Sequence, residues 1–229
     1  AWSSLFLRRH GVSLPQLSVR ATALRTGPLP EVLAGGAVDR RLAFRRRADG
    51  GYTLAPDASH EFYIGPDAFR AFRAFLPLLA KSPFDTALRP AAPRGFPDAW
   101  GTGRRWADDA QSPFERMRVL NPAPNRTEVA RLATAFAETF PGLGPVEVAA
   151  AWAGMIDTLP DRVPVVDHVP ALPGLTLVTG MSGHGFGIGP AFGRIAADLV
   201  QGRAAGHDLG RFRFDRFTDG SRLELGPDV

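Results

Sequence analysis

Apolar residues recur along this chain with two different periods, and the two periods predict different elements. Short runs of alternating or β-branched apolar residues are typical of strands, whereas apolar residues three or four positions apart predict amphipathic helices. We therefore expect an α/β (α+β) fold with a mainly antiparallel sheet. Strands are expected at residues 18–26, 42–47, 51–55, 60–64, 146–153 and 175–179, and helices at 68–81, 127–140 and 191–200.

Two residues are expected to shape the first two helices. Pro77 lies inside the first and should kink or shorten it, because proline lacks an N–H group and clashes with the preceding turn. Thr127 is the expected N-cap of the second. Residues 82–124 are rich in Pro, Gly and Arg, which predicts long connections and short strands between the two helices.

The stretch 174–202 combines an apolar strand, a glycine-rich turn and a helix. A helix N-terminus presents unpaired N–H groups and a partial positive charge, and glycines let a ligand approach the backbone. The spacing is not the dinucleotide-binding fingerprint, because Ile188 stands where a third glycine is needed. The spacing alone is equally compatible with half of a nucleotide-binding unit and with a tight turn that binds nothing. The turn glycines are Gly180, Gly183, Gly185, Gly187 and Gly189.

The composition excludes several classes of protein. The chain has 229 residues, of which 45% are hydrophobic and 22% charged, so it can bury a core in one large or two small domains. No apolar run has the length of a membrane span. The chain has no cysteine, which excludes disulfides and thiolate metal sites and fits a cytoplasmic location. The histidine and carboxylate spacings match no metal motif, so we expect no metal.

The positive charge is modest and consists almost entirely of arginine. The formal net charge is +4, and Lys81 is the single lysine. Residues 45–47, Arg-Arg-Arg, are compatible with a phosphate-binding patch, but a solvated strand end is the better interpretation. A basic stripe interleaved with aromatic residues, as nucleic-acid binding favours, does not accompany them. Nucleic acid is therefore not an expected partner.

Two motifs in the same order resemble a family of flavoenzymes. The segment Gly180-Met181-Ser182-Gly183-His184-Gly185-Phe186 resembles the flavin-contacting loop of the D-amino-acid oxidase superfamily. Upstream, AWAGM at 151–155 and TLPDRVPVVD at 158–167 resemble the stretch that precedes this loop. The likeness extends more loosely over the whole chain. It implies an FAD-dependent oxidoreductase similar to sarcosine oxidase, glycine oxidase and D-amino-acid dehydrogenase.

The resemblance also implies a division of the chain. The opening Ala-Trp-Ser-Ser is similar to a segment that lies inside family members, after their first FAD-binding stretch. Residues 1–14 would then end the FAD-binding half, and residues 15–145 would form the substrate domain. Residues 146–229 would form a separate layer, with the returning strand–loop–helix of a Rossmann-like FAD domain and a tail that packs as a strap. The expected missing partner is the N-terminal G-x-G-x-x-G half, which holds the ADP part of FAD in the family.

The resemblance implies non-covalent FAD and a set of residues around it. His184 is the candidate catalytic residue, because the matching histidine of sarcosine oxidases lies near the flavin. A structural histidine bonded to backbone is an equally good interpretation. The expected cofactor-binding residues are Ala1, Trp2, Gly154, Met155, Pro160, Asp161, Gly180, Met181, Ser182, Gly183, His184, Gly185, Phe186, Gly187 and Ile188.

The candidates for substrate recognition are weaker. Tyr52 and Tyr63 lie on predicted strands that would roof the flavin, although packed sheet tyrosines are the more common case. Several amino-acid-oxidising relatives place an arginine after the Trp-Ala-Gly turn, where it binds the substrate carboxylate. This chain has Met155 there, and Gly187 where sarcosine oxidase uses a lysine. Gly154 stands where sarcosine oxidase tethers its flavin through cysteine. Carboxylate recognition must come from elsewhere, or the substrate is not a simple amino acid.

The implied reaction is oxidation of a C–N bond in a small amine or amino acid, with hydride transfer to flavin N5 and an imine product. The alternative is a non-catalytic fragment or subunit that docks onto a separate FAD-binding chain. The substrate and the electron acceptor stay open.

Overall fold

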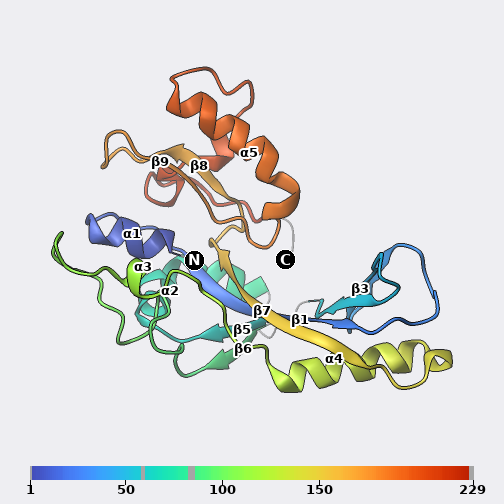
Figure 1. Ribbon diagram of the computed structural model, residues 1–229. Coiled ribbons are helices and arrows are strands. Elements are labelled where there is room, and N and C mark those ends of the chain that lie inside the picture. Colours follow the sequence, from blue (N-terminus) through green and yellow to red (C-terminus); the bar gives the residue numbers. More distant parts are fainter. Residues whose placement is uncertain (1, 58–59, 82–85, 227–229) are drawn as a thin grey trace.

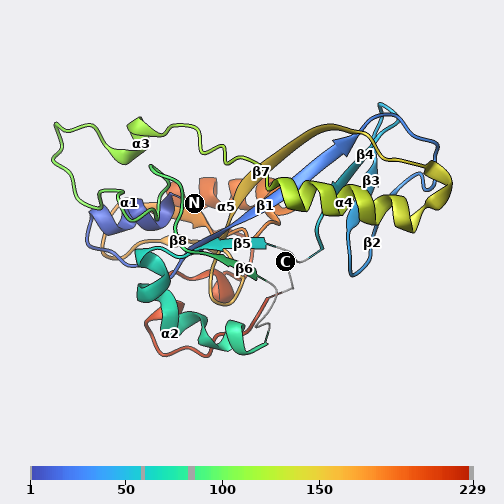
Figure 2. The same cartoon turned by 90° about the horizontal axis from the view of Figure 1, so that it is seen from below.

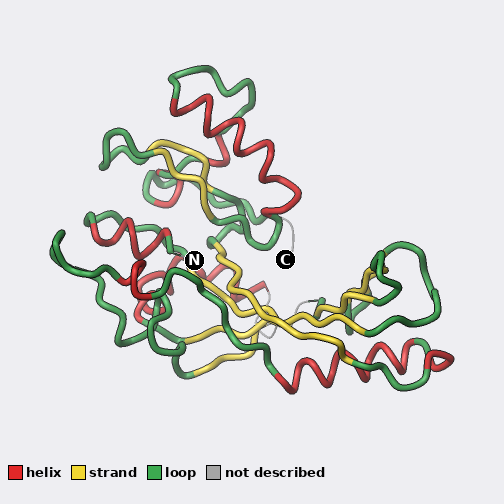
Figure 3. Tube along the Cα trace, viewed as in Figure 1, coloured by secondary structure: helices red, strands yellow, loops and turns green. Residues whose placement is uncertain are grey.

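The computed structural model of the protein describes residues 2–57, 60–81 and 86–226. Figure 1 shows a large twisted sheet with a smaller layer of two strands and a helix on one side of it. Figure 3 shows that long loops connect many of these elements, above all between α2 and α4. The mixed α/β architecture confirms the expected fold class.

The long strand β1 organises the large sheet. One edge of β1 pairs with β7 along its whole length, and the other edge pairs with β5 and β4 in turn. The order is β2-β3-β4-β1-β5-β6, with β7 on the free edge of β1, and only β6 runs parallel to its neighbour. The strands are β1 (Leu17–Thr26), β2 (Gly36–Val38), β3 (Ala43–Arg46), β4 (Tyr52–Ala55), β5 (His60–Tyr63), β6 (Thr86–Arg89) and β7 (Val148–Thr158).

The two faces of the sheet differ in cover. Helix α4 (Arg126–Thr139) packs against one face, where Leu24, Tyr52 and Phe136 form the centre of a fully buried cluster. On the opposite face, Ala21 and Ala23 of β1 are only partly buried. Figure 2 shows α4 running along β1 and β7. We call the face away from α4 the open face.

Two helical predictions need correction, and one helix was not predicted. Asn125, not Thr127, caps α4, because its side-chain oxygen accepts from the N–H groups of Thr127 and Glu128. Helix α2 (Pro66–Lys81) continues through Pro77 to Lys81, so Pro77 does not shorten it, and burial of Ala71 and Phe75 offsets the lost hydrogen bond. Helix α1 (Ser3–Arg9) was not predicted. It is too short to show a period, and burial of Leu5 and Leu7 stabilises it.

The smaller layer begins later than expected. We predicted a separate layer from residue 146, but β7 belongs to the large sheet and contains the Trp-Ala-Gly segment that we had taken for a turn. The layer itself consists of the hairpin β8 (Val165–His168) and β9 (Thr176–Thr179), covered by α5 (Gly185–Val200). Phe192 and Ile195 of α5 pack on Val166. The remaining short helices are α3 (Pro113–Arg116), η1 (Pro141–Leu143), η2 (Gly210–Phe212) and η3 (Asp215–Phe217).

Candidate functional site

The loop between β9 and α5 has an unusual backbone. Gly180, Ser182 and Gly183 have φ angles of 78°, 48° and 85°, so three of four consecutive residues are left-handed. Two of these positions are glycine, which adopts this conformation without steric cost. Ser182 is not glycine, but it is buried, and its N–H donates to the carbonyl of Asp157 at 3.1 Å. The loop conformation is therefore fixed from the side of β7.

Asp157, near the end of β7, anchors the start of the loop. Its Oδ2 accepts from the N–H of Gly180 at 2.8 Å and from Gln16 Nε2 at 2.8 Å. Thr179 Oγ1 lies 3.3 Å from the same oxygen and also accepts from Gln16 Nε2 at 2.8 Å. Sequence reasoning missed this network. The available signal in the sequence was the charged residue Asp157 between the apolar residues Ile156 and Leu159.

Close packing holds the loop on the same side. A Cβ added to Gly180 would lie 2.2 Å from Cδ1 of Leu159, the residue that follows β7, so only glycine fits at this position of the loop. Leu159 itself is fully buried. The two sequence motifs that carry the family resemblance are therefore in direct contact.

The other side of the loop and the first turn of α5 are open. Gly183, His184 and Gly187 are exposed, and Phe186 is fully exposed. No atom lies within 4 Å of a Cβ added to Gly187. Helix α5 begins at Gly185, earlier than the expected start at 188–191, so the later glycines belong to its first turns. In Figure 1 the Gly185 end of α5 is the end nearer to the large sheet.

β7 also has exposed positions. Trp152 is 42% exposed, Gly154 is exposed, and no atom lies within 4 Å of a Cβ added to Gly154. Both residues lie on the open face, because side chains alternate along a strand and Ala153 is buried on the α4 side. Met155 has the same orientation as Ala153, and it lines a small cavity together with Tyr63. The structure thus separates Met155 from Gly154.

His184 occupies the N-cap position of α5. Its backbone N–H donates to the carbonyl of Met181 at 2.9 Å, and its exposed side chain makes no capping hydrogen bond. The imidazole is therefore not used to hold the loop. Met181 is half-buried beneath the helix start, 3.3 Å from a Cβ added to Gly185, and Ile188 packs on the α5 cluster.

Pro160 and Asp161 are buried and do not share the open surface. Asp161 accepts from Arg216 Nε at 2.7 Å and from the N–H of Val163 at 3.1 Å. Arg216 belongs to the C-terminal tail, which also places Phe214 in the core. These contacts support the interpretation of the tail as a packing strap, and they give Asp161 a structural role.

The two tyrosines have different surroundings. Tyr52 is fully buried, and its hydroxyl accepts from the N–H of Val32 at 2.8 Å, which supports the packing interpretation. Tyr63 is half-buried on the α4 side of the sheet, with the Arg20 guanidinium 5.5 Å from its ring. Burial raises the pKa of Tyr63 above its usual value. Neither tyrosine lies on the open face.

The N-terminal candidates lie apart from the loop. Ala1 falls outside the residues that the structure describes. Trp2 precedes α1, and its ring packs edge-on against Phe114 at 5.4 Å between centroids. Trp2 thus takes part in an aromatic cluster of the 82–124 connection.

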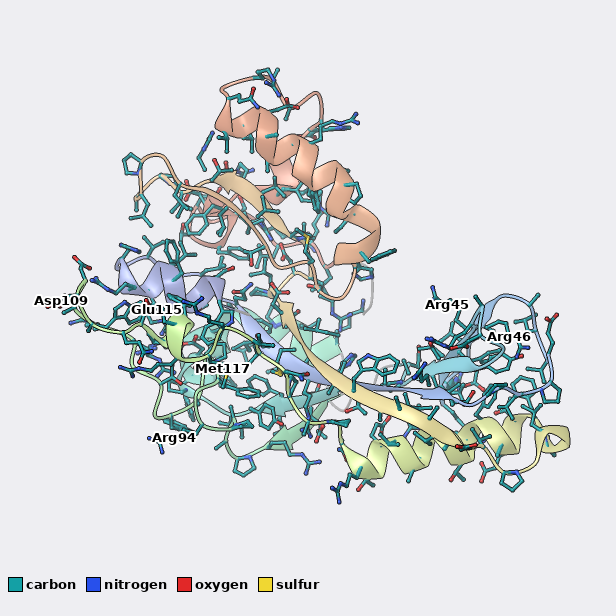
Figure 4. The ribbon with its side chains drawn as sticks, viewed as in Figure 1. Arg45, Arg46, Arg94, Asp109, Glu115 and Met117 are labelled. Carbon is teal, nitrogen blue, oxygen red and sulfur yellow. The ribbon has the colours of Figure 1, made fainter. Side chains whose placement is uncertain are left out.

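Two of the three consecutive arginines, Arg46 and Arg47, are bound by neighbouring groups of the same chain. Figure 4 places Arg45 and Arg46 on β3, at the end of the large sheet that α4 covers. Arg46 donates to the carbonyl of Leu29 at 2.9 Å and lies 4.8 Å above the Tyr52 ring, and Arg47 pairs with Asp49. These contacts support the interpretation of a solvated strand end.

The donor groups at the open surface fit a flavin. A planar ring can approach Gly154 and Gly187 because neither position carries a side chain. The free N–H groups at the start of α5 favour negative charge, as the reduced flavin pyrimidine requires. Without cysteine, the chain offers no cysteinyl link to the flavin. Over the described ranges, the structure contains no cluster of three or more metal-ligating side chains, and none of the helices found there has the length and apolar character of a membrane span.

Comparison with known proteins establishes the family. A family model described as "FAD dependent oxidoreductase" matches residues 1–199, and the chain belongs to this family of FAD-dependent flavoenzymes. Among curated proteins, N-methyl-L-tryptophan oxidase of Citrobacter koseri is 37% identical over 108 residues, which cover 47% of this chain and 27% of the relative. The enzyme of the same name from Escherichia coli K12 is 35% identical over 107 residues, covering 44% and 28%.

Solved structures give the same fold. L-amino acid deaminase from Proteus vulgaris superposes with a TM-score of 0.83 at 25% identity, covering 94% of this chain and 49% of that one. The deaminase from Proteus myxofaciens, in complex with anthranilate, gives 0.83 at 27% identity, covering 95% and 48%. Glycine oxidase from Geobacillus kaustophilus shares the fold at 16% identity and a TM-score of 0.63, covering 94% and 43%. The chain spans about half the length of these proteins.

Proposed function

We propose that the chain contributes the substrate sheet and one flavin-binding loop to an enzyme that oxidises a C–N bond in an amino acid or amine. The observation that carries this proposal is the loop at 180–187. Asp157 and Leu159 fix it from behind, and its glycines and the start of α5 are open in front. The names of the relatives, an N-methylated amino acid oxidase and an amino acid deaminase, support this substrate class.

FAD, when bound, would supply the hydride acceptor for oxidation of the C–N bond, and the imine product would be hydrolysed by water. The chain's own contribution is positional and electrostatic. The N–H groups at the start of α5 favour negative charge next to the loop. Gly154 and Gly187 leave room for a ring, and the exposed imidazole of His184 is available to contact substrate or tune charge.

A matched pair of variants tests this site. Gly187→Val places a branched side chain on the open surface, and Gly193→Val makes the same change further along α5, where space is equally free. Gly187→Val should abolish FAD binding or amine-dependent bleaching of the flavin, whereas Gly193→Val should keep both. Equal FAD content and equal turnover in the two variants would remove the loop from the cofactor site.

A second candidate is a subunit or fragment that docks onto a separate FAD-binding chain. The match covers 48–49% of the deaminases, and in this candidate the separate chain would supply the rest of the family fold. Residues 1–229 alone should then lose FAD during gel filtration and regain it when the N-terminal half of the family fold is added. Stoichiometric FAD on residues 1–229 alone would exclude this candidate.

A further inference from the structure

An apolar cavity of about 370 Å³ lies between α2 and the open face of the sheet. Val19, Phe62 and Leu88 of the sheet line it on one side, and Phe72, Phe75 and Leu79 of α2 line it on the other. Its volume falls in the range of small-molecule pockets, which are mostly apolar. Among the described residues that line it, Arg162 alone is charged.

Strand register connects this cavity to the candidate flavin site. Gly154 pairs with Ala21 and Ile156 pairs with Val19, so Val19 lies on the same face as Gly154, one pleat further along. Val19 also pairs with Phe62, and Phe62 with Leu88. Two residues of a strand span about 7 Å. The cavity therefore begins within the length of one small molecule from the place where Gly154 leaves room for the flavin.

The side of the cavity formed by α2 exposes large apolar side chains. Phe69 is 67% exposed and Phe72 is 54% exposed, and both line the cavity. Large apolar side chains at the wall of a concave site are typical of pockets that bind apolar ligands. The lack of a carboxylate among the described lining residues disfavours a cationic side chain in this place.

We propose that this α2 cavity binds the apolar side chain of the substrate, so that the substrate is an amine or amino acid with a large aromatic or aliphatic group. This inference rests on the proposed function, because it assumes that the reacting C–N bond lies over the flavin beside Gly154. The side chain then extends along the open face past Val19 and is enclosed by α2.

Binding of unreactive probes tests the cavity separately from the chemistry. Acetate, butanoate, hexanoate and 3-phenylpropanoate contain no C–N bond and differ only in apolar size. Their dissociation constants are measured by calorimetry on the longest natural chain that contains residues 1–229, with and without FAD. Affinity should rise about fourfold for each added methylene until the cavity is filled.

Two exposed residues on edge strands give a matched pair of variants. Leu88→Asp places a carboxylate in the cavity, and Val38→Asp makes the same change on β2 at the other end of the sheet. Leu88 is 65% exposed and Val38 is 63% exposed, so both variants should fold. Leu88→Asp should weaken the binding of 3-phenylpropanoate at least tenfold, while Val38→Asp should leave its dissociation constant unchanged. Ala68→Trp, which fills the cavity from α2, should act like Leu88→Asp.

The outcomes separate the two proposals. Two results, obtained while the protein binds FAD, would each overturn the cavity proposal and leave the proposed function standing. In the first, the affinities of the probes do not depend on their size. In the second, Leu88→Asp and Val38→Asp change those affinities equally. Size-dependent binding that Leu88→Asp removes supports the cavity even if FAD is not retained, in which case the proposed function fails. A cavity covered by another segment or a second copy would show no probe binding and would also overturn the inference.

Discussion

The Asp157 carboxylate accepts a hydrogen bond from the backbone N–H of Gly180 at 2.8 Å, and this bond joins the two motifs of the candidate flavin site. Asp157 lies one residue before the end of β7, the strand that carries Gly154, and Gly180 begins the loop that leads to α5. The backbone carbonyl of Asp157 also accepts from Ser182. One residue of the sheet therefore sets the position of the loop relative to the open face.

Replacing Asp157 should loosen the loop and weaken FAD binding. Asp157→Ala leaves the N–H of Gly180 and the amide of Gln16 without their acceptor, which should cost about 1–3 kcal/mol of the free energy of unfolding. FAD affinity should fall about tenfold or more, because binding must then order the loop at about 1–2 kcal/mol per residue. Urea unfolding and FAD titration of the same preparations measure the two effects.

Asp167→Ala is the matched control for this prediction. The Asp167 carboxylate also accepts from a backbone N–H at 2.8 Å, but its donor is Phe214 of the tail. This variant should lower the free energy of unfolding, and its FAD affinity should fall no more than that loss of stability accounts for. Equal effects on FAD affinity in both variants would mean that Asp157 acts only through global stability. Asp157→Asn, which keeps one acceptor for Gly180, should have a smaller effect than alanine.

The regular elements were predictable because their periods are local. The expected strand at 18–26 is β1 with a start one residue earlier, and the expected helix at 127–140 is α4 within one residue. The start of α5 was placed too late, since glycine disfavours helix and Gly185, Gly187 and Gly189 predicted a turn. Packing of Phe192 and Ile195 overrides that preference.

The candidate site was only partly predictable, because its order comes from contacts distant in sequence. The motif glycines could be proposed from the family resemblance, and Gly154 and Gly187 lie on open surface. No local pattern shows that Gln16 bonds Asp157, a residue 141 positions away. Likewise, Asp161 matched a flavin-lining position in sequence, yet Arg216 from the tail binds it.

The buried pair Asp161–Arg216 should be important for stability. Its side chains are only 3% and 5% exposed, and Nε lies 2.7 Å from the carboxylate. Arg216→Ala leaves a buried carboxylate unpaired and should cost about 3–5 kcal/mol of the free energy of unfolding. Denaturant unfolding measures this loss, and limited proteolysis should show earlier cleavage of the tail.

The exposed pair Asp198–Arg203 provides the comparison. It lies at the end of α5 with a similar separation of 2.6 Å, but Arg203 is half-exposed. Arg203→Ala should cost less than about 1 kcal/mol, because solvent screens the pair. A loss for Arg216→Ala no larger than that for Arg203→Ala would show that the tail is not held by this ion pair.

Asp98 should make stability depend on pH in an unusual direction. Burial, and then the neighbouring Asp67 carboxylate, raise the pKa of Asp98 to about 6. Its oxygens accept from the N–H of Asp67 and from Arg104, both at 2.9 Å. Because the folded protein binds this proton more tightly than the unfolded chain, the contribution is fully present below about pH 3.8 and is lost as the pH rises through about 6.

The variant Asp98→Asn mimics the protonated form and should remove this dependence. Its melting temperature minus that of the natural protein should therefore become more positive between pH 4 and pH 7. Glu61→Gln should behave oppositely. Burial acts to raise the pKa of Glu61, but hydrogen bonds from Arg20 and Arg89 outweigh it and lower the pKa below its usual 4.5, so its stabilisation is present above pH 4.5 and lost in acid. The difference for Glu61→Gln should become more negative over the same range. Two differences of the same sign would contradict the assigned pKa direction of Asp98 or Glu61.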